Sequence, residues 1–315
     1  MSRGQKIHNN KAKKYMSDVI LLDGGMGQEL VRRHNRPPTA LWSNAVTLEQ
    51  PDLIGQLHQE YIAAGADVIT LNTYTATPYR LARDADIALL GPLHRAAINQ
   101  ALRAREQMAN PSIRIAGCLP PLVASYQADV KLPTSTAQLE YEQLVALQAE
   151  AVDLFICETM ESIAEAQVAA KCAKAVGKPV WVSFTVQDQP HDCQIGTLRS
   201  GEDLDTAIAA MTDLKVDGVL INCSTPEAIN ASWPKLKTFQ GLFGAYGNAF
   251  QNVAALKPGG TVEALVTRHE LDPKHYAQFA LQWLKDGASI VGGCCEITPA
   301  HIRAIAQALG RVNAH

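Results

Sequence analysis

The stretch DLFICETMESIAEAQVAAKCAKAVG, residues 153–177, contains the unit that decides the fold. It opens with a short, uninterrupted apolar run, DLFIC, which is typical of a parallel strand buried on both faces. The polar pair Glu158 and Thr159 follows, and then comes an Ala-rich amphipathic stretch that stops at Gly177, as helices often do. The sequence therefore predicts a strand, a polar turn and a helix, in that order.

The same unit recurs along the chain, with amphipathic helical stretches between the apolar runs. The other runs are DVILL (18–22), DVITL (67–71), IRIAG (113–117), PVWVSFTV (179–186), DGVLI (217–221), LFGAY (242–246) and ASIVG (288–292). Alternation of about eight strands and helices predicts a single (β/α)8 TIM barrel, which we place at residues 17–312. A doubly wound sheet is the alternative, but no glycine-rich dinucleotide fingerprint follows any run. The longest irregular stretch, 248–271, falls after the seventh run, where a barrel keeps active-site loops.

Composition fits an enzyme-sized globular protein. The chain has 315 residues, a net charge of -3, 47% hydrophobic and 19% charged residues, so neither nucleic acid nor membrane is expected as a partner. No apolar run reaches the roughly 18 residues of a membrane span, and the basic segment 1–16 lacks the apolar core of a signal peptide. We expect that segment to be a disordered arm. Seven cysteines, an odd number, indicate a reducing compartment and hence a cytoplasmic protein.

Three cysteines stand directly after apolar runs: Cys223, and the adjacent pair Cys294 and Cys295. A disulfide within the pair is disfavoured, because neighbouring Cα atoms lie about 3.8 Å apart, below the usual range of about 4.4–6.8 Å. Zinc held by three thiolates explains the pattern better, with the fourth tetrahedral position left for a ligand. Gly292 and Gly293 let the chain bend so that both sulfurs face one ion. The alternatives are three inert buried thiols or a redox pair.

Polar residues at the other strand ends are predicted to gather on the same face of the barrel, where barrel enzymes keep their active sites. These positions are Asp23-Gly24-Gly25, Asn72-Thr73, Gly117-Cys118, Glu158-Thr159, Asn222 and Gly247-Asn248. Asp23 and Glu158 are predicted to grip a substrate ammonium, and their alternative roles are helix capping and structural ion pairing. Trp42 and Tyr74 fall in loops at the predicted mouth, where aromatic rings either attract a cation or simply pack.

The remaining thiols and imidazoles are not predicted to bind metal. We place Cys157 and Cys172 in the core and Cys118 and Cys193 on loops. The nine histidines show no HExxH or paired spacing, and His58 and His94 are expected on helices as surface or packing residues.

Seven segments carry a resemblance that spans residues 18–309: LLDGGMGQEL (21–30), LWSN (41–44), GADVITLNTYTATPYRL (65–81), ICETM (156–160), VSFTV (182–186), LINCSTPEAI (220–229) and IVGGCCEITPAHI (290–302). In this order they resemble the homocysteine S-methyltransferase family, and the NC and GGCC motifs are the most specific part. One segment departs from the family pattern. GCLPPLVASYQAD (117–129) replaces a GPYGA-like loop on the face where substrate and donor should meet.

The resemblance implies that Cys223, Cys294 and Cys295 bind catalytic zinc and that Asp23 and Glu158 hold the amino group of homocysteine. We expect the substrate contacts to come from a set at the strand ends: Asp23, Gly24, Asn72, Thr73, Glu158 and Asn222. A free thiol, with a pKa of about 8.5, is mostly protonated at neutral pH, and ligation to zinc removes the proton. No catalytic residue beyond this zinc-activated thiolate is expected.

The favoured activity is therefore transfer of a methyl group from a sulfonium, S-methylmethionine or S-adenosylmethionine, to homocysteine, which gives methionine. Betaine is the alternative donor. The homocysteine half of a corrinoid methionine synthase is disfavoured, because the chain has no room for folate and cobalamin modules. A non-catalytic zinc or thiol sensor is the alternative from another class of protein. The sequence leaves the oligomeric state open.

Overall fold

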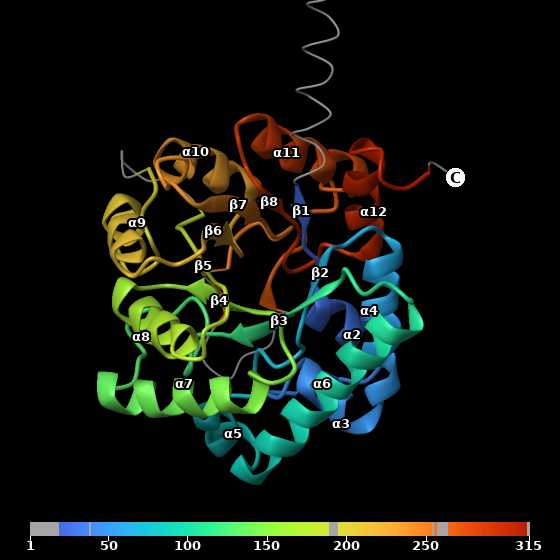
Figure 1. Ribbon diagram of the computed structural model, residues 1–315, viewed down its shortest axis with the longest axis vertical. Helices are drawn as coiled ribbons and strands as arrows, with labels where there is room; N and C mark the ends of the chain where they lie inside the picture. Colours follow the sequence, from blue (N-terminus) through green and yellow to red (C-terminus); the bar gives the residue numbers. More distant parts are fainter. Residues whose placement is uncertain (1–18, 38, 189–194, 254, 257–263, 314–315) are drawn as a thin grey trace, which may run out of the picture.

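Eight parallel strands form the barrel in the computed structural model, which describes residues 19–37, 39–188, 195–253, 255–256 and 264–313. All eight predicted runs are confirmed as strands (Figure 1). They are β1 (Ile20–Leu21), β2 (Val68–Thr70), β3 (Arg114–Leu119), β4 (Leu154–Met160), β5 (Val180–Phe184), β6 (Gly218–Asn222), β7 (Leu242–Tyr246) and β8 (Ile290–Val291).

Helices follow the strands and surround them (Figure 1). After β1 come α2 (Met26–His34), α3 (Ser43–Glu49) and α4 (Pro51–Ala63), and after β2 come α5 (Pro78–Asp84), the 3-10 helix η1 (Ile87–Leu89) and α6 (Leu90–Gln107). The later strands are followed by α7 (Thr134–Gln148), α8 (Ile163–Lys174), α9 (Leu204–Asp213), α10 (Pro226–Leu236), α11 (Pro273–Lys285) and α12 (Pro299–Ala308).

The sheet closes on itself. Its strand order is β1-β8-β7-β6-β5-β4-β3-β2, and a parallel bridge between Leu22 and Val68 joins β1 to β2. The Asp23 amide also donates to the Val68 carbonyl at 3.0 Å. The (β/α)8 barrel prediction is therefore confirmed, and the doubly wound alternative is wrong because an open sheet has no such closure.

The core has two layers because side chains alternate along each strand. On β4, Leu154 and Ile156 belong to the cluster that fills the barrel, whereas Phe155 and Cys157 belong to the larger cluster under the helices. Both faces of the strand are buried, which explains why the parallel strands appear in the sequence as continuous apolar runs.

Aspartates at the start of three strands set the register of the neighbouring strand. The Asp67 carboxylate accepts a hydrogen bond from the Leu21 amide at 2.8 Å, Asp153 from Ile115 at 2.7 Å, and Asp217 from Val180 at 2.8 Å. Each bond satisfies an amide where the ladder begins, so the polar first residue of runs such as DLFIC has a structural role.

Several helices stop at glycine, as predicted. Gly177 after α8 and Gly287 after α11 have φ angles of 73° and 103°, in the region that residues with a Cβ rarely adopt. The long connection between β7 and α11 is also confirmed. The arm predicted for residues 1–16 lies outside the described residues and stays a prediction. Among the helices of the described segments, none combines the length and apolarity needed to cross a bilayer.

Candidate functional site

A pocket opens at the carboxyl ends of the strands and has an empty volume of about 1180 Å³, open solvent at its mouth included. Its lining comes from β4 and from the ends of six further strands and the connections that follow them. The residues that matter below are Asp23, Gly24, Trp42, Asn72, Tyr74, Arg80, Ser125, Tyr126, Glu158, Thr159, Cys223, Tyr246, Leu256, Cys294 and Cys295. Because strand ends converge at one face of a barrel, residues far apart in the chain meet here.

The three predicted metal ligands lie together. The sulfur atoms of Cys223, Cys294 and Cys295 are all within 4.8 Å of one another. Cys223 is buried and follows β6, whereas Cys294 and Cys295 follow β8 and are partly exposed. In the structure Cys223 and Cys294 form a disulfide across Cα atoms 5.7 Å apart, and Cys295 is free. Reduction of this disulfide returns three thiols to one point, so zinc ligation and a redox pair, the alternative named from the sequence, both remain predictions.

The last residue of β7 and the loop after it hold all three cysteines through their main chain. The Cys223 amide donates to the Tyr246 carbonyl at 3.3 Å, and the Cys294 amide donates to the Gly247 carbonyl at 2.9 Å. The Cys295 carbonyl accepts from the Ala249 amide at 3.1 Å. Side chains on β6 and β8 therefore share one frame, which fixes the distance between the sulfurs.

Glycines beside the cysteines allow close approach of main chains. A Cβ on Gly25 would lie 2.6 Å from the Cys294 carbonyl oxygen, and one on Gly24 would lie 2.2 Å from the Ile297 carbonyl oxygen. Gly292 and Gly293 are equally crowded, against Leu22 and Ile297, and neither has a positive φ. These two glycines are therefore needed for space, and neither uses the left-handed backbone conformation that glycine allows.

Three sulfurs converging from two strand ends fit a metal ion as a donor set. Cysteine sulfurs are the ligands that zinc favours, and a three-residue set leaves one position open. Burial raises the pKa of the Cys295 thiol to about 12, with Glu296 and Glu158 adding to the effect. A cation at this point would offset both contributions, because thiolate ligands are held by the charge of the ion.

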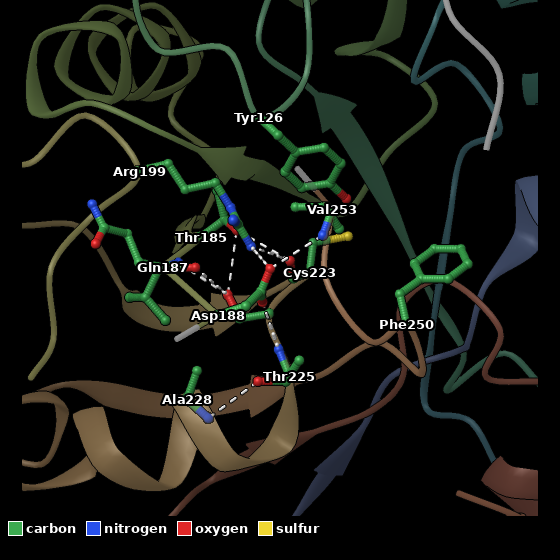
Figure 2. A network of polar contacts seen from close by, with 12 residues as sticks. Tyr126, Thr185, Gln187, Asp188, Arg199, Cys223, Thr225, Ala228, Phe250 and Val253 are labelled. Carbon is green, nitrogen blue, oxygen red and sulfur yellow. Dashed lines mark hydrogen bonds and ion pairs between the residues drawn. The ribbon is translucent and has the colours of Figure 1, made fainter. Parts of the chain in front are cut away.

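A buried polar network supports Cys223 from behind (Figure 2). Arg199 donates to the Thr185 hydroxyl at 2.9 Å, to the Asp188 carboxylate at 3.0 Å and to the Cys223 carbonyl at 3.3 Å. Asp188 also accepts from the amides of Thr225 at 3.1 Å and Val253 at 3.3 Å. The network joins three loops, so the main chain of Cys223 is fixed by its neighbours.

Backbone strain concentrates at this pocket. Eight described residues other than glycine have a positive φ, and four of them line the pocket: Trp42, Tyr126, Thr159 and Cys223. The φ of Cys223 is 47°, and its carbonyl is held by Arg199 and the Thr185 hydroxyl. Such conformations persist where surrounding contacts over-determine them, which is common at functional sites.

Asp23 and Glu158 both line the pocket. Asp23 accepts from the Thr70 amide at 2.7 Å, and Glu158 accepts from the Cys118 thiol at 2.9 Å. Burial raises the pKa of Asp23 to about 8, partly opposed by the Thr70 amide, and burial raises the pKa of Glu158 to about 7. Because the Glu158 carboxylate also disfavours charge on Asp23, a cation between them would stabilise both ionised forms.

The other predicted contacts differ in access to the pocket. Gly24 and Asn72 line it, although the Asn72 amide is engaged by Ser43 and Thr47. Thr73 is buried and does not line it. The Asn222 oxygen accepts from the Thr159 amide at 3.0 Å and the Ser183 hydroxyl at 2.8 Å. Asn222 is fully buried and is not among the residues that line the pocket, so the structure gives it a positioning role beside Glu158.

Sequence reasoning placed Cys118 on a loop, and this is wrong. Cys118 belongs to β3, is buried, and donates to Glu158. The strand extends two residues past the apolar run IRIAG, so its end was set too early. Cys157 and Cys172 are buried as predicted, and Cys193 lies outside the described residues. His58 and His94 are both buried packing residues, and surface exposure is excluded.

Aromatic side chains form part of the pocket wall. Trp42 and Tyr74 line it as predicted, with ring centroids 6.2 Å apart in an edge-to-face arrangement. Sequence reasoning missed Tyr126 and Tyr246, which also line it. Tyr126 packs against a small cluster from the loop after β7, whose members are Phe250, Val253, Leu256 and Leu265. A cation in this pocket would face several π systems.

Comparison with known proteins gives consistent matches over almost the whole chain. The model of the family described as homocysteine S-methyltransferase matches residues 20–309. Homocysteine S-methyltransferase of Escherichia coli (strain K12) is 31% identical over 91% of this chain and 94% of that protein. Homocysteine S-methyltransferase YbgG of Bacillus subtilis (strain 168) is 26% identical over 91% and 93%.

Solved structures match as well. The metallated form of the homocysteine methyltransferase MmuM from Escherichia coli superposes with a TM-score of 0.76 at 27% identity, over 92% of this chain and 96% of that chain. The oxidized form of the same protein gives a TM-score of 0.73 at 27% identity over the same shares.

Proposed function

Because the chain belongs to the homocysteine S-methyltransferase family, we propose that it transfers a methyl group from a sulfonium donor to the thiol of L-homocysteine, giving methionine. The observation that carries the proposal is the convergence of Cys223, Cys294 and Cys295 beside two buried carboxylates in one pocket. S-methylmethionine and S-adenosylmethionine are the donors we favour, with betaine as the alternative.

In the reduced protein, Cys223, Cys294 and Cys295 would hold a zinc ion with one position open for the substrate sulfur. When bound, zinc supplies a thiolate at neutral pH by lowering the pKa of its sulfur ligand. The existence of a relative in a metallated form supports a metal here. The frame formed by the Gly247 and Ala249 main chain keeps the cysteine sulfurs at a fixed separation, so a metal ion held by them would occupy one place in the pocket.

The carboxylates of Asp23 and Glu158 would orient homocysteine through its ammonium group. Each has a raised pKa in the empty pocket, and a bound ammonium favours their ionised forms. Asn222 holds the Thr159 main chain and hydroxyl, at 3.0 and 2.9 Å, and so positions the neighbouring Glu158. With its sulfur and its nitrogen both anchored, homocysteine would present one sulfur lone pair to the donor.

A sulfonium donor suits the rest of the pocket. Trp42, Tyr74 and Tyr126 supply aromatic surface that attracts a cationic sulfur or nitrogen. The reaction forms a carbon–sulfur bond to homocysteine and breaks the bond between the methyl carbon and the donor sulfur, which leaves as a neutral thioether. Charge is thereby lost, so exclusion of water by the surrounding side chains favours the reaction.

The test is methyl transfer from a panel of donors to homocysteine under reducing conditions, read by mass, together with metal analysis. We expect about one zinc per chain, and loss of most metal and activity in Cys223→Ser, Cys294→Ser and Cys295→Ser. Cys172→Ser is the matched control, because this thiol lies on α8 away from the pocket and should change neither readout.

Full activity in chelated protein without detectable metal would refute the mechanism. Metal binding with no turnover on any donor would favour the sensor alternative. We also propose a cytoplasmic location, since four of the six cysteines in the described residues are free and the proposed ligands must be reduced.

A further inference from the structure

Arg80 is a buried cation on the wall of the pocket. It belongs to α5, only 8% of its surface is exposed, and it is among the residues that line the pocket. Its Nη2 donates to the Pro121 carbonyl at 2.8 Å and to the Ser125 hydroxyl at 3.3 Å. The guanidinium carbon lies 5.4 Å from the centroid of the Tyr74 ring.

This guanidinium has no ion-pair partner among the described carboxylates, and its buried Nε has no hydrogen-bond partner. Glu161 and Glu165 favour its charge from a distance. The neighbouring arginines differ: Arg83 binds the Asp84 carboxylate at 2.7 Å, and Arg199 binds Asp188 at 3.0 Å. A guanidinium stays charged at any physiological pH, and burying it without an anion is costly. An anion is therefore missing from its surroundings.

The missing anion belongs in the pocket, since this is the open space that Arg80 faces. A guanidinium matches a carboxylate through parallel hydrogen bonds, and the Ser125 and Tyr74 hydroxyls, 2.9 Å apart, lie beside it as further donors. Sulfonium amino acids carry a carboxylate as well as the cationic sulfur. The aromatic surface of Tyr74 and Trp42 adjoins Arg80, so the two charges of one such molecule find opposite partners close together.

We propose that Arg80 binds the carboxylate of the methyl donor, so that this pocket selects a sulfonium amino acid over a sulfonium without a carboxylate. The proposal rests on the function proposed above and makes its donor class narrower. It also gives a reason for the unusual segment 117–129: Pro121 and Ser125 in that segment hold the arginine in place.

The donor, and not homocysteine, is the ligand assigned to Arg80 because of where the arginine lies. Arg80 and its contacts come from the connections after β2 and β3, whereas the cysteines follow β6 and β8. In the closed ring β2 and β6 are on opposite sides, and Figure 1 shows α5 at the bottom of the view and β6 and β8 in its upper half. The function proposed above anchors homocysteine at its sulfur through the cysteines and at its ammonium through Asp23 and Glu158, and we assign the remaining side of the pocket, which carries Arg80, to the second substrate.

A purely structural role is the competing explanation, because Arg80 also fastens the segment 121–125. Other contacts already do this: Thr77 donates to the Leu122 carbonyl at 2.7 Å, and Arg83 donates to the Val123 carbonyl at 2.9 Å. Two uncharged acceptors also do not neutralise a buried cation. The structural role predicts equal damage to every donor, and the binding role predicts damage confined to donors with a carboxylate.

The experiment compares Arg80→Gln and Arg80→Lys with the parent, using S-methylmethionine and trimethylsulfonium as a matched pair of donors. Calorimetry gives the Kd of each donor, and initial rates give KM with homocysteine as acceptor. We expect Arg80→Gln to weaken S-methylmethionine about 10- to 100-fold in Kd and KM. The Kd and KM of trimethylsulfonium and of homocysteine should change less than about twofold, because we expect neither ligand to contact Arg80. Arg80→Lys keeps the charge, and its affinity for S-methylmethionine should lie between that of the parent and that of Arg80→Gln.

Arg103→Gln is the matched control, because this arginine lies on α6 outside the residues that line the pocket and is paired with Asp52 at 3.3 Å, so both donors should be unaffected. Equal weakening of the two donors, or weakening of homocysteine instead, would overturn the assignment of Arg80. If Arg80→Gln does not fold, the comparison of donors in Arg80→Lys decides. Binding of S-methylmethionine that depends on Arg80 without any turnover would support this inference and refute the proposed function. Failure of the parent to bind S-methylmethionine would overturn both.

Discussion

Replacing Arg199 by methionine should destabilise the protein and the proposed metal site together. The Arg199 and Asp188 side chains are 11% and 5% exposed, so their ion pair is buried, and removal of one partner leaves a carboxylate without its counterion. Losing one member of a buried pair costs about 3–5 kcal/mol. With an unfolding entropy of about 2.1 cal/mol/K per residue, that cost lowers the melting temperature of a chain of 315 residues by roughly 5–8 °C.

The assay is thermal unfolding followed by circular dichroism, with zinc affinity measured by competition with a chelator. Affinity should fall because Arg199 also holds the Cys223 carbonyl and so positions a ligand. Arg36→Met is the control: its ion pair with Glu49 is between side chains 61% and 43% exposed and is worth less than about 1 kcal/mol. Adding Asp188→Asn to Arg199→Met removes the stranded charge and should recover part of the stability. A melting temperature unchanged by Arg199→Met, with normal zinc affinity, would refute this account of the network.

Three further predictions concern the carboxylates and the thiol. Homocysteine should release about one proton per zinc-loaded site at neutral pH and methionine none, measured by calorimetry in buffers of different ionisation enthalpy; equal release by both would count against thiolate ligation. Asp23→Asn and Glu158→Gln should each weaken the binding of homocysteine by about 1.5–3 kcal/mol, the contribution of a charge-assisted hydrogen bond, and should leave the zinc content unchanged. If both variants bind homocysteine as tightly as the parent, the two residues have a structural role only. Burial raises the pKa of Glu161 to about 8, so the stability it gives below its unfolded pKa is lost as the pH rises towards 8. The free energy of unfolding of Glu161→Gln, measured in urea relative to that of the parent, should therefore rise by at most about 5 kcal/mol between pH 4.5 and pH 8. A constant difference across that range would contradict a raised pKa for the buried Glu161 carboxyl.

The barrel could be predicted because its strands are buried on both faces. Burial leaves continuous apolar runs such as LFGAY, which coincides with β7. The ends of the strands were less accurate, because hydrogen bonding to neighbours decides where a strand stops. β4 continues through the polar pair Glu158 and Thr159 to Met160, which pairs with Phe184 after a register shift. No local property of ICETM indicates that extension.

The candidate site was predictable only in part. Cysteines at strand ends meet for topological reasons, so Cys223 and Cys294 could be brought together across 71 residues. Arg80 could not be found in the same way. It stands in the segment PYRLARD beside Arg83, and one of these arginines is buried and lacks a counterion while the other is paired with Asp84. That difference arises from tertiary packing against the segment 121–125, and nothing in the helix itself encodes it.

The ring closure between β1 and β8 has a consequence for biosynthesis. Asp23 follows the first strand, Cys294 and Cys295 follow the last, and Cys223 lies between them, held by a loop that the β8 connection completes. A growing chain that has made seven strands possesses one of the three sulfurs and no closed pocket. The proposed metal site can therefore form only after translation of the eighth strand, and an interrupted chain would lack two of its three sulfurs.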